Sequence, residues 1–231
     1  MKIYIIRHGQ STHNANQDNP HNPDPPLTTL GREQAQRTAV ALRETGLGAV
    51  ALYASPQRRA LETAAFLQQA LQLSPHILPD LCEAGGLGEH AGLCRNEILR
   101  EWPGVTLEER VTEQGWWTGG ESDREEAVFY PRAEQALALL RARHGENEDT
   151  IILVTHGRFG SALLSTILGL GPAGYSRYPF DNCGISRADY DPHEQVGYAP
   201  PPISSGSEET RIAVRLRFHN QVEHLPLSLR T

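Results

Sequence analysis

Two histidines occupy similar settings, each shortly after an apolar run. His8 follows residues 2–6 through Arg7, and His156 follows residues 150–154 through Thr155. Short runs rich in β-branched residues that stop abruptly are typical of buried strands. Because the carboxyl ends of parallel strands lie on the same side of an open α/β sheet, we expect both imidazoles to face a shared pocket.

Histidine paired with arginine suits the transfer of a phosphoryl group. A neutral imidazole has a usual pKa of about 6.5, so it can attack phosphorus at neutral pH and form a phosphohistidine. Guanidinium groups can balance the phosphoryl charge by two-pronged hydrogen bonding. Nearly all the positive charge of the chain is guanidinium, since Lys2 is the only lysine among 21 lysines and arginines. Gly9 and Gly157, directly after the two histidines, would let backbone amides approach a ligand.

Five segments occur in the order and spacing of a known family. They resemble the signatures of the histidine phosphatase superfamily, which includes cofactor-dependent phosphoglycerate mutases, fructose-2,6-bisphosphatases and broad-specificity phosphatases. The resemblance extends over most of residues 1–170. Arg-His-Gly alone is a weak signal, but five motifs in register are specific. The matching segments are residues 7–14, 27–35, 55–64, 120–122 and 155–157.

The resemblance implies roles for individual residues. His8 corresponds to the nucleophile that is transiently phosphorylated, and Arg59 corresponds to the family's phosphate-binding arginine. Arg58, its neighbour, falls at a variable position and is expected to be solvated. The other residues that the resemblance places around the phosphoryl group are Arg7, Asn14, His156 and Gly157.

The proton donor is less well marked by the sequence. In the family a glutamate after the third strand protonates the leaving oxygen, and Glu83 in Leu81-Cys82-Glu83 fits that place. The residues after it depart from the family pattern, with His90 in place of a tryptophan. Glu83 is therefore the favoured donor, and Glu89 is the alternative.

Three functions remain open at this point. The resemblance favours a metal-independent phosphatase that hydrolyses small phosphate monoesters, because mutases of the family carry a Trp-Asn dipeptide where this chain has His13-Asn14, and a lysine-rich segment that it lacks. A cofactor-dependent phosphoglycerate mutase is the first alternative. A domain that binds phosphorylated ligands or proteins without turnover is the second.

The pattern of elements predicts one domain over residues 1–231. Its expected class is α/β, a three-layer sandwich around a mostly parallel sheet, with a small helical cap at about 84–130 and a long loop at about 191–210. The Trp116-Trp117 pair is expected to pack in the core. Strands are expected at 2–6, 49–54, 75–81, 150–154, 183–190 and 212–218, and helices at 32–45, from Ser55-Pro56 onward, at 131–144 and at 159–168.

Composition disfavours some classes of binding partner. The formal charge is −7, which disfavours nucleic-acid binding, and no apolar run is long enough to span a bilayer. We therefore expect a soluble, cytoplasmic protein that acts on a small phosphorylated metabolite and needs no cofactor. Neither the ten histidines nor the three cysteines show the spacing of a metal site or a disulfide framework. A homo-oligomer is compatible with the sequence.

Overall fold

A seven-stranded sheet forms the centre of the protein. The computed structural model describes residues 1–17, 22–120, 124–171, 178–195 and 212–231. The strands are ordered β4-β3-β2-β5-β1-β6-β7; β6 is antiparallel to both of its neighbours, β1 and β7, and all other neighbouring pairs are parallel. They are β1 (Lys2–Arg7), β2 (Ala51–Ala54), β3 (Pro75–Ile77), β4 (Thr106–Leu107), β5 (Thr150–Thr155), β6 (Ile185–Gln195) and β7 (Ile212–Gln221).

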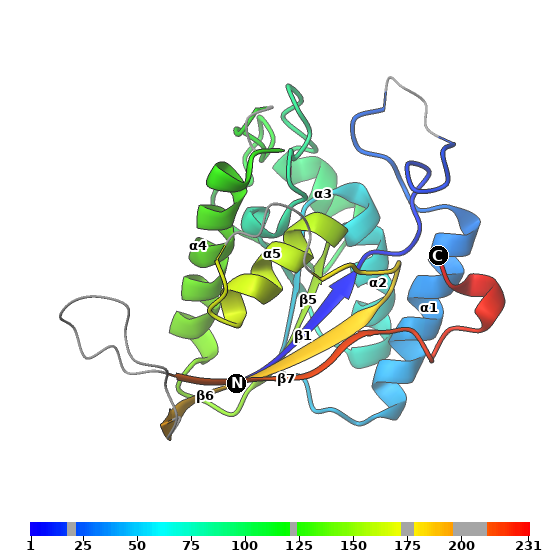
Figure 1. The fold of residues 1–231 in the computed structure, drawn as a ribbon. Helices are drawn as coiled ribbons and strands as arrows, with labels where there is room; N and C mark the ends of the chain where they lie inside the picture. The colour runs from blue at the N-terminus through cyan, green and yellow to red at the C-terminus, as the bar shows by residue number, and fades with distance from the viewer. Residues whose placement is uncertain (18–21, 121–123, 172–177, 196–211) are drawn as a thin grey trace.

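Helices cover both faces of this sheet (Figure 1). Helices α4 and α5 pack on one face, and α1, α2 and α3 lie on the other side. This is the predicted three-layer α/β architecture. The helices are α1 (Thr29–Glu44), α2 (Arg58–Leu71), α3 (Arg95–Glu101), α4 (Glu126–His144) and α5 (Gly157–Ile167), with short 3₁₀ turns at Pro79–Leu81 and Leu227–Leu229.

Strand β5 shows why the sheet needs helices on both faces. All six of its residues are buried. Ile151 and Leu153 enter the core beneath α4 and α5, whereas Ile152 and Val154 enter the core beneath α1 and α2. A strand buried on both faces reads as a continuous apolar run, as this one does in the sequence.

Helix α2 begins later than predicted. Ser55 is not its N-cap, because the helix starts at Arg58 with Gln57 in the N-cap position. The physical reason is a carboxylate from another loop: both oxygens of Asp24 lie 3.0 Å from the Arg58 backbone nitrogen and accept its N–H. This leaves the Ser55 hydroxyl for other partners.

Other boundaries also differ from the sequence prediction. Helix α4 starts at Glu126 and contains Pro131, which was expected to open it. Burial of Phe129 and Tyr130 offsets the backbone hydrogen bond that proline removes. Strand β6 continues to Gln195, so the start of the predicted 191–210 loop is strand, and its remainder from residue 196 falls outside the described residues.

The Trp116-Trp117 pair packs in the core, as the sequence predicted. Trp116 is buried in the core and Trp117 packs partly buried against it, edge to face. Cys82 and Cys183 are buried thiols, while Cys94 is half-buried. Within the described ranges, no helix combines the length and the apolar character required for crossing a membrane.

Candidate active site

The central strand pair brings the two histidines together. β1 and β5 are parallel neighbours, and Arg7 lies in register with Thr155. The residues that follow, His8 and His156, therefore emerge side by side, with ring centroids 5.0 Å apart. Both are buried, with exposed fractions of 3% and 0%.

Hydrogen bonds hold the His8 ring in the tautomer whose Nε2 carries a lone pair. Its Nδ1 lies 2.7 Å from the carbonyl oxygen of Gly9, which can only accept, so Nδ1 carries the hydrogen. Its Nε2 then accepts a hydrogen bond from Arg59 Nε at 3.1 Å. Burial, followed by the charges of Arg59 and Arg7, lowers the pKa of His8 well below its usual range. The imidazole is therefore neutral at pH 7.

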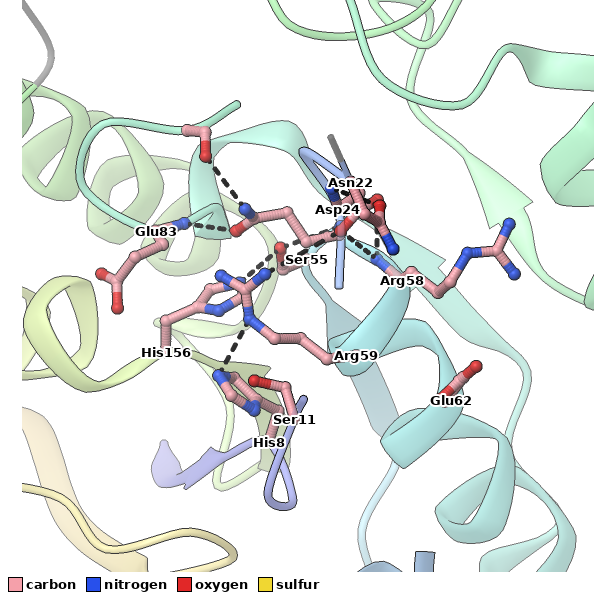
Figure 2. Close-up of polar contacts among 12 residues, drawn as sticks. His8, Ser11, Asn22, Asp24, Ser55, Arg58, Arg59, Glu62, Glu83 and His156 are labelled. Carbon is pink, nitrogen blue, oxygen red and sulfur yellow. Dashed lines mark hydrogen bonds and ion pairs between the residues drawn. The ribbon is translucent and has the colours of Figure 1, made fainter. Parts of the chain in front are cut away.

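Adjacent arginines at the start of α2 point to different places. Figure 2 shows the Arg59 guanidinium reaching over His8, whereas Arg58 extends away from the histidines. Arg58 Nη1 lies 2.7 Å from a carboxylate oxygen of Glu101. Asp24 lies 3.9 Å from Arg59 Nη1, so the carboxylate that caps α2 also stands beside the guanidinium. The structure thus brings Arg59, and not Arg58, to the histidines, as the family resemblance predicted.

Two buried nitrogens of the site lack hydrogen-bond partners within the described residues. One is Arg7 Nε, although Arg7 Nη1 donates to the Phe180 carbonyl at 2.6 Å. The other is His156 Nδ1, although His156 Nε2 lies 2.8 Å from Ser55 Oγ. Burying unpaired polar nitrogens is costly unless a ligand satisfies them. A phosphoryl group beside His8 would provide acceptors for both.

Electrostatics at these residues suit an anion. Burial lowers the pKa of Arg7, partly countered by the charge of Glu83, and burial together with Arg59 lowers the pKa of His156 well below its usual range. If the Ser55 hydroxyl donates to His156 Nε2, the neutral ring carries its hydrogen on Nδ1, where it can donate to a phosphoryl oxygen.

Asn14 lines the cavity that also contains His8, and three hydrogen-bond donors fix its side chain. Its Oδ1 accepts from the Ser11 backbone N–H at 3.2 Å, from Ser11 Oγ at 3.1 Å and from Asn182 Nδ2 at 3.1 Å. A backbone N–H can only donate, so this orientation leaves Asn14 Nδ2 as the atom able to donate to a ligand. Asn182 also donates to the His8 carbonyl at 3.0 Å. Sequence reasoning missed Ser11 and Asn182, and no motif marked Asn182.

Glu83 lies at the amino end of α5, half-buried in the cavity wall. Its Oε1 accepts N–H groups from Ala84 at 2.9 Å and from Phe159 at 2.8 Å, and Oε2 accepts from Arg158 at 3.3 Å. Its backbone N–H donates to Gln57 at 2.8 Å. Glu89 lines the same cavity but is exposed.

A guanidinium from α4 fixes the segment that carries Glu83. Arg132 donates to three carbonyl oxygens of this segment: Nη1 lies 2.9 Å from the oxygen of Asp80 and 2.7 Å from that of Cys82, and Nη2 lies 3.3 Å from that of Glu83. Its guanidinium also stacks over the ring of Phe159, 4.3 Å from the centroid. The backbone before the carboxylate is thus anchored to both helices of one sheet face.

The two glycines after the histidines differ in how closely the protein packs around them. A Cβ on Gly9 would lie 2.4 Å from the backbone oxygen of Gly31, so Gly9 permits close packing against α1. A Cβ on Gly157 would meet only the Arg7 side chain, at 3.5 Å, which is ordinary contact. Gly157 is the first residue of α5 and its backbone conformation does not require glycine.

His8 lines a polar cavity of about 870 Å³, whereas the buried His156 is not part of the cavity wall. Its wall includes His13, whose side chain is exposed at the rim. Among the described residues, no group of three or more His, Cys, Asp or Glu side chains is arranged to hold a metal ion. The inner wall comprises Arg7, His8, Asn14, Arg59 and Glu83, and the outer wall comprises Asn22, residues 84–88, Glu89, His90 and Arg124.

Comparisons with known proteins agree with this geometry. The histidine phosphatase superfamily (branch 1) matches residues 3–197. A probable phosphoglycerate mutase, GpmB, of Enterobacter sp. (strain 638) is 33% identical over 193 residues, covering 82% of this chain and 85% of the relative.

Solved structures share the fold over nearly the whole chain. One titled mycobacterial hydrolase 1 is 26% identical with a TM-score of 0.64, covering 95% of this chain and 98% of its own. A mycobacterial glucosyl-3-phosphoglycerate phosphatase in complex with VO3 is 24% identical with a TM-score of 0.65, covering 96% and 99%. The arginine and histidine motifs, the parallel sheet that joins them and these matches together show that the chain belongs to branch 1 of the histidine phosphatase superfamily.

Proposed function

We propose that this protein is a metal-independent phosphatase that hydrolyses small phosphate monoesters through a phosphohistidine at His8. One observation carries the proposal: a buried, neutral imidazole presents Nε2 beside Arg59, next to two buried nitrogens, Arg7 Nε and His156 Nδ1, that have no partner within the described residues. This is a nucleophile placed within a preformed anion site.

In the first step, His8 Nε2 attacks phosphorus in line with the leaving oxygen. The N–P bond forms as the P–O bond to the leaving group breaks. Arg59 Nε–H now bonds to the same Nε2 lone pair, so it must turn to a phosphoryl oxygen as substrate binds. Arg7, His156 and Asn14 supply further donors to the phosphoryl oxygens, and protonated Glu83 gives its proton to the leaving oxygen.

In the second step, water attacks the phosphohistidine. Glu83, now a carboxylate, takes a proton from the water as the O–P bond forms, and the N–P bond breaks to return neutral His8 and inorganic phosphate. The same residue serves both steps because the second reverses the proton transfer of the first. Glu83 is favoured over Glu89, since it is half-buried and held by backbone N–H groups whereas Glu89 is exposed.

A phosphoglycerate mutase is the second candidate, because the relative of 33% identity is named as a probable one. A mutase must keep water from the phosphohistidine until a second hydroxyl arrives. Exposed side chains at the cavity rim, His13, Glu89 and His90, favour access of water to His8 instead. Phosphoglycerate interconversion with a bisphosphoglycerate primer, much faster than phosphate release, would assign the mutase reaction.

The experiment that tests the proposal is capture of the intermediate. Wild-type protein is mixed with para-nitrophenyl phosphate labelled in the phosphate and quenched in alkali, which preserves a phosphohistidine. We expect label on His8 by peptide mapping, and a drop in hydrolysis of about 10³-fold or more in His8→Ala. Label on another residue, or hydrolysis that survives in His8→Ala, would refute it. Activity that chelators abolish and magnesium restores would contradict the metal-free mechanism.

A further inference from the structure

Arg124 is a cation in the outer wall of the cavity that contains His8. Its side chain lies against the backbone of Gly85: a Cβ on that glycine would be 2.7 Å from Arg124 Cγ and 3.1 Å from Nε. Gly85 has a φ of +86°, a conformation that L side chains rarely adopt. A glycine at position 85 thus allows the arginine to lie across the loop that follows Glu83.

Arg124 makes no ion pair with any residue that the structure describes. The cavity offers two carboxylates, and neither neutralises it. Glu83 accepts backbone N–H groups at the amino end of α5, and Glu89 is more than 4 Å from the guanidinium, since no ion pair joins them. The other two arginines of the wall, Arg7 and Arg59, stand at the histidines.

The cavity has room for more than a phosphoryl group. At about 870 Å³ it is within the range of pockets that enclose whole metabolites. The wall between Glu83 and Glu89 consists of Ala84, three glycines and Leu87. The side chains of Arg124 and Trp117 pack against Gly85 and Gly86, whereas a Cβ on Gly88 would meet no atom within 4 Å, so the loop is open at that glycine. A leaving group whose oxygen is at Glu83 can therefore extend along this loop toward Arg124.

We propose that Arg124 binds an anionic group on the leaving group, so that the preferred substrates are phosphate monoesters bearing a carboxylate or a second phosphate. The inference rests on the proposed phosphatase function. Carboxylate and phosphate share the planar, two-pronged hydrogen bonding that guanidinium provides. Because Arg124 is exposed, we expect it to raise kcat/KM for esters with a second anionic group only about tenfold over matched esters without one.

The test compares substrates that differ only in the second anion. Phosphoserine against phosphoethanolamine isolates the carboxylate, and fructose 1,6-bisphosphate against fructose 1-phosphate isolates the second phosphate. We expect wild-type kcat/KM to favour the anionic member of at least one pair about tenfold, and Arg124→Gln to bring that ratio near one. Arg124→Lys should keep part of it. Arg43→Gln, which removes an exposed arginine from α1, should leave the ratio at the wild-type value.

Failure of this inference can be separated from failure of the proposed function. No preference in wild type, or a preference that survives Arg124→Gln, overturns the role of Arg124 even when all four esters are hydrolysed. If none is hydrolysed, the phosphatase assignment fails, and the role of Arg124 is decided by binding. Calorimetry with the same ligands and the His8→Ala protein should show the same tenfold preference and its loss in His8→Ala/Arg124→Gln.

Discussion

The inner and outer halves of the cavity are built differently. In the inner half, His8, Arg59 and Asn14 are each fixed by hydrogen bonds to neighbouring groups, and His8 and His156 are almost fully buried. In the outer half, Glu89, His90 and Arg124 are exposed on or beside a glycine-rich loop. Groups that act on the phosphoryl centre need fixed geometry, whereas the outer side chains can vary with the leaving group without disturbing it.

The largest expected effect separates two glutamates on the same loop. Glu83→Gln removes the proposed proton donor. Because para-nitrophenol is a good leaving group that needs little protonation, an alkyl phosphate is the better substrate for measuring this loss. We expect kcat to fall on the order of 10²- to 10³-fold for the alkyl ester. The matched change Glu89→Gln should alter it by less than about threefold.

Steady-state rates of phosphate release measure both variants. A large loss in Glu89→Gln with little loss in Glu83→Gln would place the proton donor in the outer half, and the division of the cavity into two halves would then be wrong.

The next effect separates two adjacent arginines. Arg59→Lys keeps the charge but loses the Nε–H that now bonds to His8 and the second prong for a phosphoryl oxygen. We expect kcat/KM to fall on the order of 10²-fold, as for removal of one preorganised donor. Arg58→Lys, whose side chain points to Glu101, is the control and should stay within about twofold of wild type.

Binding of vanadate, followed by thermal shift, gives a second measurement that does not depend on turnover. Equal losses of vanadate stabilisation in the two variants would show that the whole start of α2, and not one guanidinium, forms the anion site.

The smallest expected effect concerns stability against pH. Burial lowers the pKa of both His8 and His156 in the folded protein, so below pH 6.5 the unfolded chain binds protons that the folded chain does not. Unfolding is therefore favoured as pH falls. Between pH 7.5 and 5.5 we expect wild type to lose about 1 to 3 kcal/mol more unfolding free energy than His8→Gln/His156→Gln. Urea titrations at each pH measure it, and parallel curves for the two proteins would contradict burial of two neutral rings.

Local sequence signals predicted the strands that carry the two histidines, but not the contacts that distant segments make around them. The apolar runs before His8 and His156 fixed their strands, and parallel pairing then brought the two rings to 5.0 Å. Contacts between distant segments carried no such signal. Asn182 is 174 residues from the carbonyl it contacts at His8, and Asp24 caps a helix that begins 34 residues later. Nothing in local periodicity encodes pairings of this kind.

The failed prediction for helix α2 has the same origin. Ser-Pro is a good local start for a helix, but a carboxylate from another loop supplies the cap and moves the boundary to Arg58. The packing at Gly9 has a similar origin, because only the folded structure shows that a side chain there would collide with the backbone of Gly31.

The contacts of Arg132 limit how helix α4 of this protein can be replaced. The Arg132 guanidinium on α4 donates to one carbonyl oxygen within the 3₁₀ turn that leads to Glu83 and to two carbonyl oxygens after it, and it stacks on the ring of Phe159 in α5. An ammonium group cannot reach several oxygens in one plane while stacking on a ring. A different α4 grafted to change the substrate range would therefore need an arginine at the position of Arg132. Without it, the segment that carries Glu83, the proposed proton donor, would lose the contacts that align it with the leaving oxygen.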